Sequence, residues 1–141
     1  MEYRTDIPDI GHYQQLCQST DWTEFHNLDN SAFSLALNNS LFCISAYDDS
    51  RLVGCGRVVS DGIIYAAIYD VMVLPEYKQL GIGTEIVRRL LNKCAQANIG
   101  VVQLFAASRT EIFYKKLGFE RRPDDAPGMV YTGKTIGKSA P

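Results

Sequence analysis

The chain has 141 residues, of which 46% are hydrophobic and 21% are charged. This is the composition of a folded globular protein rather than of a disordered one, and the length suits one domain with a single core. The formal net charge of -2 gives no electrostatic reason to expect nucleic acid or an anionic membrane as a partner. We therefore expect neither.

The first ten residues, MEYRTDIPDI, contain no apolar core of signal-peptide length, and no later stretch is as long and apolar as a membrane span. A cytoplasmic protein is the resulting expectation. The four cysteines form no CxxC pair and have no histidine at ligand spacing, so we expect no metal. We interpret them as small buried hydrophobic residues. They are Cys17, Cys43, Cys55 and Cys94, and the strand register decides whether Cys43 and Cys55 face each other.

The first 40 residues predict a short strand and two helices. The strand is expected over residues 2–5, and Pro8 stands at the start of the first helix. The apolar residues of that helix share one face: Ile10, Tyr13, Leu16 and Cys17. An aromatic-rich connection, DWTEFHNLDNS, precedes the second helix. There we expect Asn30 or Ser31 as the N-cap and Ala32, Leu35 and Ala36 on the inner face.

The middle of the chain predicts three antiparallel strands in succession, over residues 41–47, 52–60 and 63–74. The turn residues DDSR separate the first two strands, and Asp61-Gly62 separates the second from the third. Pro75 ends the third strand.

The residues after this meander predict a helix, a buried strand and a shorter helix. The first helix carries a continuous apolar stripe, Ile82, Ile86, Val87, Leu90, Leu91 and Cys94. Residues 101–106 are typical of a buried strand reached by a parallel crossover. In TEIFYKKLG we expect Gly118 to cap the short helix in a left-handed conformation, with Phe119 folded back against Tyr114.

MVYTG, from Met129, predicts a last strand. The fold class is thus α+β, a mixed and mostly antiparallel sheet with helices on both faces. One domain is expected over residues 1–133, followed by a polar tail over residues 134–141.

Gly81 and Gly83 stand where the long helix begins. The sequence lacks the Gly-Lys-Ser/Thr end of a phosphate-binding P-loop, and Ile86 occupies the place of a third dinucleotide-binding glycine. The first turn of a helix nevertheless offers unpaired N–H groups and partial positive charge, and glycine lets an anion approach them closely. Lys78 adds a charge and Thr84 a hydroxyl. Residues 78–84 are therefore compatible with a pyrophosphate site, and also with a merely flexible connection.

Two stretches resemble the GCN5-related N-acetyltransferase (GNAT) family, which has the acyl-CoA N-acyltransferase fold. DVMVLPEYKQLGIGTEIV contains a form of the family motif Gln/Arg-x-x-Gly-x-Gly/Ala, and EIFYKKLGF contains the tyrosine that precedes Gly-Phe. The two motifs stand in the family's order, and the order of strands and helices agrees over nearly the whole chain.

The resemblance implies an acetyl-CoA site. The loop amides would hold the pyrophosphate and the backbone of the third strand would pair with the pantetheine amides. That strand usually carries a bulge and diverges from its neighbour; the sequence leaves this open. Lys78 replaces the usual Gln or Arg, and Ala107 replaces a cofactor-binding Asn, so Ala107 receives no role. The implied cofactor-binding residues are Val71, Met72, Val73, Lys78, Gln79, Leu80, Gly81, Ile82, Gly83 and Thr84.

The chemistry implied by the resemblance is direct attack of an amine on the thioester, with Tyr114 as the acid that protonates the leaving thiolate. Its alternative role is packing against Phe119. Asp70, the only acid in its strand, is either the general base or a structural residue that fixes a bulge. Glu24 and His26 are further candidates for a proton relay. A backbone N–H near Met72 or Val73 would stabilise the oxyanion.

The acceptor is expected to be the primary amine of a small molecule or peptide. Trp22, Phe25, His26 and Tyr65 are the candidate acceptor-binding residues, and the aromatic ones could equally be part of the core. Two other functions stay open: an acyl-CoA-binding sensor without turnover, and an interaction domain whose glycines only shape a turn. Exposed strand edges are compatible with a homodimer.

Overall fold

The structure is a computed structural model that describes residues 1–133. The chain forms two compact units, Met1–Ala106 and a second unit that begins at Ala107. The polar tail predicted for residues 134–141 lies outside the described residues.

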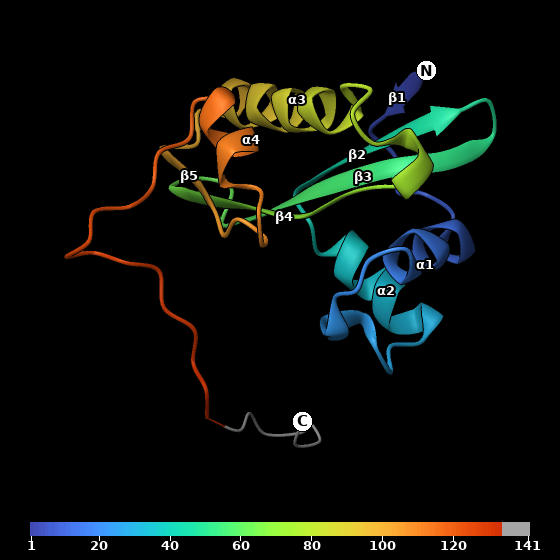
Figure 1. The fold of residues 1–141 in the computed structure, drawn as a ribbon, viewed down its shortest axis with the longest axis horizontal. Coiled ribbons are helices and arrows are strands. Elements are labelled where there is room, and N and C mark those ends of the chain that lie inside the picture. Colours follow the sequence, from blue (N-terminus) through green and yellow to red (C-terminus); the bar gives the residue numbers. More distant parts are fainter. Residues whose placement is uncertain (134–141) are drawn as a thin grey trace. The chain divides into compact units, whose positions relative to one another are not determined.

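The first unit contains a five-stranded sheet in the order β1–β2–β3–β4–β5 (Figure 1). The strands are β1 (Glu2–Arg4), β2 (Phe42–Asp48), β3 (Arg51–Ser60), β4 (Tyr65–Val73) and β5 (Val101–Leu104). The first four are antiparallel neighbours, and β5 is parallel to β4. The predicted mixed sheet is thus confirmed, with its meander and its parallel crossover.

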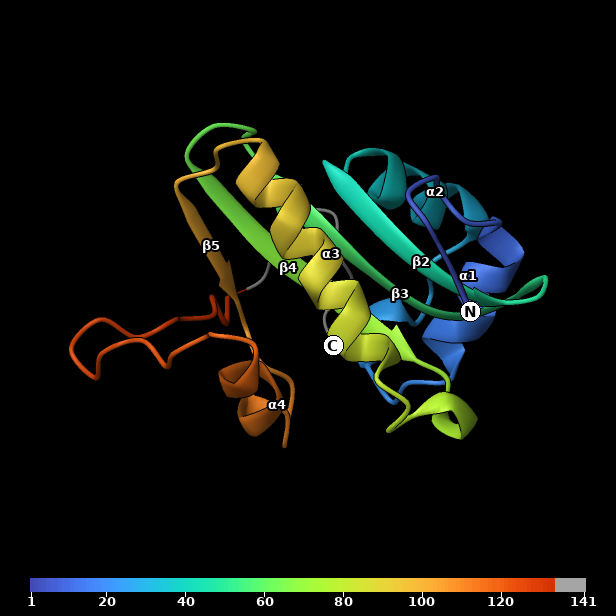
Figure 2. The same ribbon diagram turned by 90° about the horizontal axis from the view of Figure 1, so that it is seen from above.

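Helices cover both faces of this sheet, as predicted. On one face lie α1 (Ile10–Gln18), the short 3-10 helix η1 (Thr23–Phe25) and α2 (Asn30–Asn38) (Figure 1). On the other face, after the 3-10 helix η2 (Pro75–Tyr77), α3 (Ile82–Gln96) packs over β2, β3 and β4 (Figure 2). None of the described helices is both long enough and apolar enough to cross a membrane.

Aspartates begin both helices of the α1–α2 face. The Asp9 carboxylate accepts from the His12 N–H at 3.0 Å, and the Asp29 carboxylate accepts from the Ala32 N–H at 2.9 Å. The predicted caps Asn30 and Ser31 were therefore wrong, because the helix already begins at Asn30.

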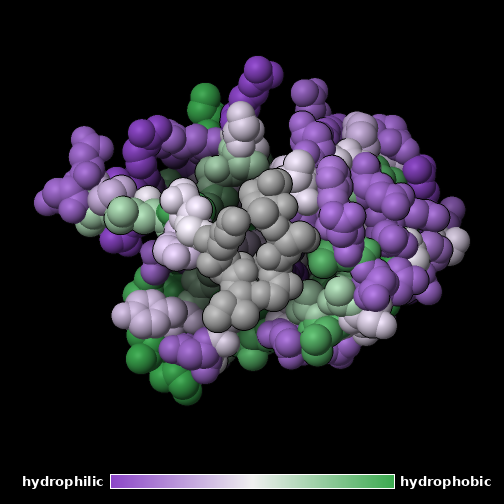
Figure 3. Space-filling model, turned by 90° about the horizontal axis from the view of Figure 1, so that it is seen from below, coloured by the Kyte–Doolittle hydropathy of each residue, from purple (hydrophilic) through white to green (hydrophobic). Residues whose placement is uncertain are grey.

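The predicted inner face of α2 was also wrong. Phe33 and Leu37 are buried, whereas Leu35 is 63% exposed and the two alanines are only half-buried. Phe33 and Leu37 remove more apolar surface from water than alanines do, so the helix turns their face inward. The ring of Phe33 meets that of Tyr13 of α1 edge-on, with centroids 5.8 Å apart. Hydrophilic residues cover most of the outer surface of these two helices (Figure 3).

The apolar stripe predicted for α3 is confirmed. Ile82, Ile86, Val87, Leu90 and Cys94 are buried, and Leu91 is half-buried. The helix lies close to the sheet because β3 has glycines beneath it. A Cβ added at Gly56 would lie 2.8 Å from Ile86 Cγ2, which is too close for any side chain.

All four cysteines are buried free thiols, as predicted. Cys43 of β2 and Cys55 of β3 point to the same side of the sheet, with their sulfurs 3.5 Å apart.

The second unit contains α4 (Glu111–Lys116), which ends as predicted. Gly118 has a φ of 98°, its N–H donates to Lys115 O at 3.1 Å, and the Phe119 N–H donates to Tyr114 O at 3.1 Å. The rings of Phe119 and Tyr114 meet edge-on at 5.8 Å. This is the Schellman arrangement of a helix end with its apolar contact.

The strand predicted at Met129–Gly133 is not formed. Met129, Val130 and Tyr131 are 85%, 81% and 78% exposed and have no regular secondary structure. An alternating apolar sequence becomes a strand only where a partner strand is available, and residues 107–133 contain none.

Candidate active site

β4 contains a bulge at the position of Asp70. Cys55 pairs with Met72 and Arg57 with Tyr69, so that Gly56 of β3 faces both Asp70 and Val71. Asp70 has a φ of 55°, in the left-handed region that few residues other than glycine adopt and that aspartate tolerates better than most. The sequence had left this bulge open.

The pairing between β4 and the edge strand β5 ends before the bulge. β5 pairs with β4 only from Tyr65 to Ile68, whereas Met72 and Val73 pair with β3 on their other side. Within the part of the chain that the structure describes, no strand pairs with the outer edge of β4 at residues 71–73. An extended ligand could add there as a further strand.

The loop between η2 and α3 presents unpaired backbone N–H groups. Gln79 and Gly81 have φ values of 63° and 82°, and the first bond of the helix runs from the Glu85 N–H to Gly81 O at 3.0 Å. Among residues 1–133, no group accepts from the backbone N–H groups of residues 79–84. Together with the helix dipole, these groups form a cradle suited to an anion.

Among residues 1–133, nothing occupies the space beside Gly81 in this cradle. A Cβ built on Gly81 meets no atom within 4 Å, and the side chains of Lys78 and Leu80 are exposed. The start of the loop is instead fixed, because the Tyr77 hydroxyl donates to Asp48 Oδ2 at 2.6 Å. The loop is therefore anchored at its base and open where the amides point.

Asp70 forms an ion pair with Arg57 of β3. Arg57 Nε donates to Asp70 Oδ2 at 2.7 Å, and the two side chains are only 19% and 17% exposed. Burial by itself would lower the pKa of Arg57, but the bond to Asp70 and its charge outweigh this and raise it. Asp70 Oδ1 has no hydrogen-bond partner among the described residues. One oxygen of the carboxylate is thus held by the protein while the other can accept a proton.

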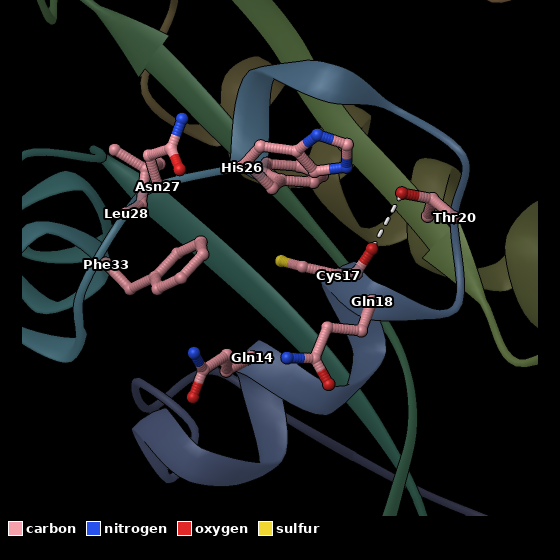
Figure 4. Close-up of a pocket in the computed structure, with 9 residues that line it drawn as sticks. Gln14, Cys17, Gln18, Thr20, His26, Asn27, Leu28 and Phe33 are labelled. Carbon is pink, nitrogen blue, oxygen red and sulfur yellow. Dashed lines mark hydrogen bonds between the residues drawn. The ribbon is translucent and has the colours of Figure 1, made fainter.

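A cavity of about 250 Å³ lies between α1 and the connection that leads to α2 (Figure 4). Phe25 and His26 line it, together with seven further residues: Gln14, Cys17, Gln18, Thr20, Asn27, Leu28 and Phe33. The Cys17 thiol points toward the ring of Phe33, and Gln14 and Gln18 approach from α1 (Figure 4).

Cys17, which lines this cavity, is within electrostatic range of Asp70 at the bulge. Burial, and after it the charge of Asp70, raises the pKa of the Cys17 thiol to about 12. Cys17 is therefore inert at neutral pH, since the thiolate is the reactive form.

The predicted acceptor residues fall in different places. Trp22 packs against Phe25, with ring centroids 5.8 Å apart, but does not line the cavity. Tyr65 stands at the opposite end of β4 from residues 71–73. With Phe105 and Gln103 it lines a separate hollow of about 390 Å³. The structure thus brings Phe25 and His26 together and leaves Tyr65 apart from them.

Tyr114 belongs to the second unit. It lies on α4, half-buried, and burial raises the pKa of its phenol above the ordinary value. Among the described residues its hydroxyl has no hydrogen-bond partner. Tyr114 is therefore protonated at neutral pH and has a proton to donate.

A family model of the acetyltransferase (GNAT) domain matches residues 39–121, which include both the cradle and Tyr114. The chain belongs to the GNAT family. An uncharacterized N-acetyltransferase of Pyropia yezoensis is 36% identical over 84% of this chain and 68% of its own length.

Solved structures share the fold of this GNAT protein. A GNAT-family acetyltransferase of Streptococcus pneumoniae superimposes with a TM-score of 0.79 at 29% identity, over 95% of this chain and 98% of its own. The PaiA N-acetyltransferase of Thermoplasma acidophilum, solved in complex with coenzyme A, has a TM-score of 0.69 at 16% identity and covers 86% of this chain and 92% of its own. At 16% identity, the similarity to the PaiA N-acetyltransferase shows a shared fold only.

Sequence reasoning missed Arg57 and the amide side chains of the cavity. A signal for Arg57 existed, because it is the only charged residue within LVGCGRVVS once the strand has begun. A cation in an apolar strand needs a buried partner, and Asp70 is the only acid in the next strand. No comparable signal marked Gln14 or Gln18, which are ordinary residues for a helix.

Proposed function

We propose that this GNAT protein uses acetyl-CoA to acetylate the primary amine of a small molecule or peptide, by direct attack within a ternary complex. The observation that carries the proposal is that the protein has both an open strand edge at residues 71–73 and unpaired backbone amides at residues 79–84. Pantetheine needs the first and a diphosphate needs the second. Membership of the family, and a relative of this fold bound to coenzyme A, support the same ligand.

In this proposal the diphosphate lies against the N–H groups of Gln79 to Thr84, with the Lys78 ammonium beside it. A compact ammonium supplies charge without the two-pronged geometry of arginine. The pantetheine amides pair with the backbone of Val71, Met72 and Val73. Because no atom of residues 1–133 lies within 4 Å of the place a Gly81 Cβ would take, the diphosphate could approach the Gly81 amide closely.

The transfer step forms a carbon–nitrogen bond and breaks the carbon–sulfur bond of the thioester. The neutral amine attacks the carbonyl carbon, and a backbone N–H near Met72 or Val73 donates to the oxyanion. The amine proton goes to Asp70 Oδ1, directly or through one water, and the thiolate takes the Tyr114 proton. Solvent then returns the two groups to their starting states.

The cavity between α1 and α2 is the proposed place of the acceptor. Cys17, which lines it, is within electrostatic range of Asp70, and His26 and the ring of Phe25 line it as well. Neutral amide side chains dominate the rest of its polar lining, which suits an acceptor with uncharged polar groups around its amine.

Two measurements test the proposal in sequence. Coenzyme A at about 100 times its dissociation constant should stabilise the protein by roughly 2.7 kcal/mol in a thermal shift experiment. Release of free thiol from acetyl-CoA should then depend on an amine, in a panel that includes tyramine and Nα-acetyl-lysinamide. No stabilisation at millimolar coenzyme A would contradict any acyl-CoA site, whereas stabilisation without amine-dependent release would identify a sensor.

A further inference from the structure

Arg57 joins three elements of the first unit. From β3 its Nε reaches Asp70 on β4 at 2.7 Å, and its Nη1 reaches the Ser40 hydroxyl, just beyond α2, at 3.2 Å. Nη1 also lies 3.5 Å from the Ala36 carbonyl, to which the Ser40 hydroxyl donates at 3.0 Å. One guanidinium thus holds the bulge of β4 and the end of α2 together.

Each contact suits a guanidinium better than any other side chain. Ala36 is in the last turn of α2, where carbonyls lack helical partners and the dipole favours a cation. Asp70 is a carboxylate whose second oxygen is left open. Arginine has planar donors that point in several fixed directions, whereas a lysine ammonium could not meet Asp70 Oδ2 and Ser40 Oγ with the same geometry.

The pair contributes less to stability than its burial suggests. Two charges lose most of their hydration at 19% and 17% exposure, and an apolar pair of equal volume is often as stable. Asp70 also adopts a φ of 55°, which is unfavourable for any residue with a side chain. This ion pair costs desolvation, and it lies at a residue with a strained backbone beside an open strand edge. We infer that the Asp70 carboxylate has to be held in a defined position.

We propose that Arg57 is a positioning residue for acetyl transfer. It fixes the carboxylate of Asp70 so that Oδ1 meets the acceptor amine, and it ties that carboxylate to α2, whose Phe33 lines the acceptor cavity. This inference rests on the proposed N-acetyltransferase function and adds to it a link between the cofactor strand and the acceptor side. Arg57 itself touches neither substrate.

The experiment compares three variants with the wild type and with a matched control. Arg57→Met removes the charge and both ties, Arg57→Lys keeps the charge, and Ser40→Ala removes only the tie to α2. Arg89→Met is the control, because Arg89 makes an ion pair with Glu85 at 2.8 Å on the exposed side of α3. Thiol release gives kcat and KM with tyramine and Nα-acetyl-lysinamide as acceptor probes. Calorimetry with coenzyme A counts the competent sites in each preparation.

For Arg57→Met we expect kcat per competent site to fall by roughly tenfold to a hundredfold, since a displacement of about 1 Å can cost a hundredfold in rate. The KM for acetyl-CoA should stay within about twofold, because the strand edge and the cradle remain. Arg57→Lys should recover part of the loss, Ser40→Ala should lose less than Arg57→Met, and Arg89→Met should match the wild type. In an Asp70→Asn background, Arg57→Met should have little further effect.

Other results overturn the inference. A kcat per competent site equal to wild type would do so, as would a loss that simply multiplies with that of Asp70→Asn, since Arg57 would then not act through Asp70. If the wild type transfers acetyl to no amine, the proposed function fails separately. Hydrogen exchange then decides the link, because Arg57→Met must accelerate exchange both at residues 36–40 and at residues 69–73. Unchanged exchange at either segment would remove the tie.

Discussion

The bulge of β4 and the cradle before α3 both contain a residue in the left-handed region, and the protein treats them in opposite ways. At the bulge the residue is Asp70, whose side chain is bound by Arg57 on a neighbouring strand. At the cradle the residues are Gln79 and Gly81, and among residues 1–133 no atom lies within 4 Å of the place a Gly81 Cβ would take. The first position is filled and held by the protein; the second is left empty.

In the proposed acetyl transfer, this difference would separate two requirements of the reaction. A group that moves a proton must be held in place before the substrate arrives, so strain and buried charge are acceptable there. A surface that holds a diphosphate needs bare amides and free space, which only glycine gives at that φ. If this is so, substitutions in the cradle should change ligand affinity without changing the chemical step or the stability of the fold to the same extent.

The largest effect is expected for Gly83→Asp. A carboxylate in the first turn of α3 would repel the diphosphate and compete for the same amides, so affinity for coenzyme A should fall more than a hundredfold, in line with the several kcal/mol that like charges cost when brought together. The same carboxylate favours the helix N-terminus, so the free energy of unfolding should be unchanged or about 0.5 kcal/mol higher. Calorimetry and urea unfolding measure the two quantities.

Gly83→Asn is the matched control, because asparagine has nearly the size of aspartate without its charge. It should lose much less affinity than Gly83→Asp. Equal losses would mean that bulk rather than charge is excluded from the cradle.

Tyr114→Phe should separate chemistry from binding. Without the phenol, the leaving thiolate has no positioned proton, and general acid catalysis of this kind typically contributes a hundredfold or more, so kcat should fall by about a hundredfold. The affinity for coenzyme A, measured by calorimetry, should stay within about twofold. The ring contact with Phe119 survives the change, so the melting temperature reports any loss of the α4 cap. Unchanged turnover would remove Tyr114 from the mechanism.

Local sequence patterns predicted most of the fold. The α3 stripe repeats over the whole helix, and the turn residues between strands have defined conformations, so both could be found without tertiary information. The inner face of α2 could not be found in this way, because it is decided by what Phe33 meets on α1. The strand at Met129 failed for a related reason, since strand formation depends on a partner that its own sequence does not specify.

The candidate site likewise has one part that local sequence can indicate and one part that depends on tertiary structure. The cradle is continuous in the chain, so the two glycines and the helix after them could indicate its position, while its ligand stays a prediction. The pair of Arg57 and Asp70 depends on the register between β3 and β4, and a bulge changes that register by one residue. The role of Asp70 therefore could not be judged before its partner was known.

The smallest effect is expected for Gly81→Ala, which has an internal control. Gly62, in the turn between β3 and β4, has the same φ of 82° and the same empty surroundings as Gly81. Alanine at either position adopts an unfavourable backbone conformation, so each change should lower the free energy of unfolding by about 1 kcal/mol.

In the proposed complex, only the Gly81 change would place a methyl group in the path of the diphosphate. Affinity for coenzyme A should therefore fall by roughly tenfold, about 1.4 kcal/mol, in Gly81→Ala and should stay at the wild-type value in Gly62→Ala. Urea unfolding and calorimetry on both variants give the two comparisons. Equal affinities in the two variants, with equal losses of stability, would mean that Gly81 serves the turn alone and that the space in front of it holds no ligand.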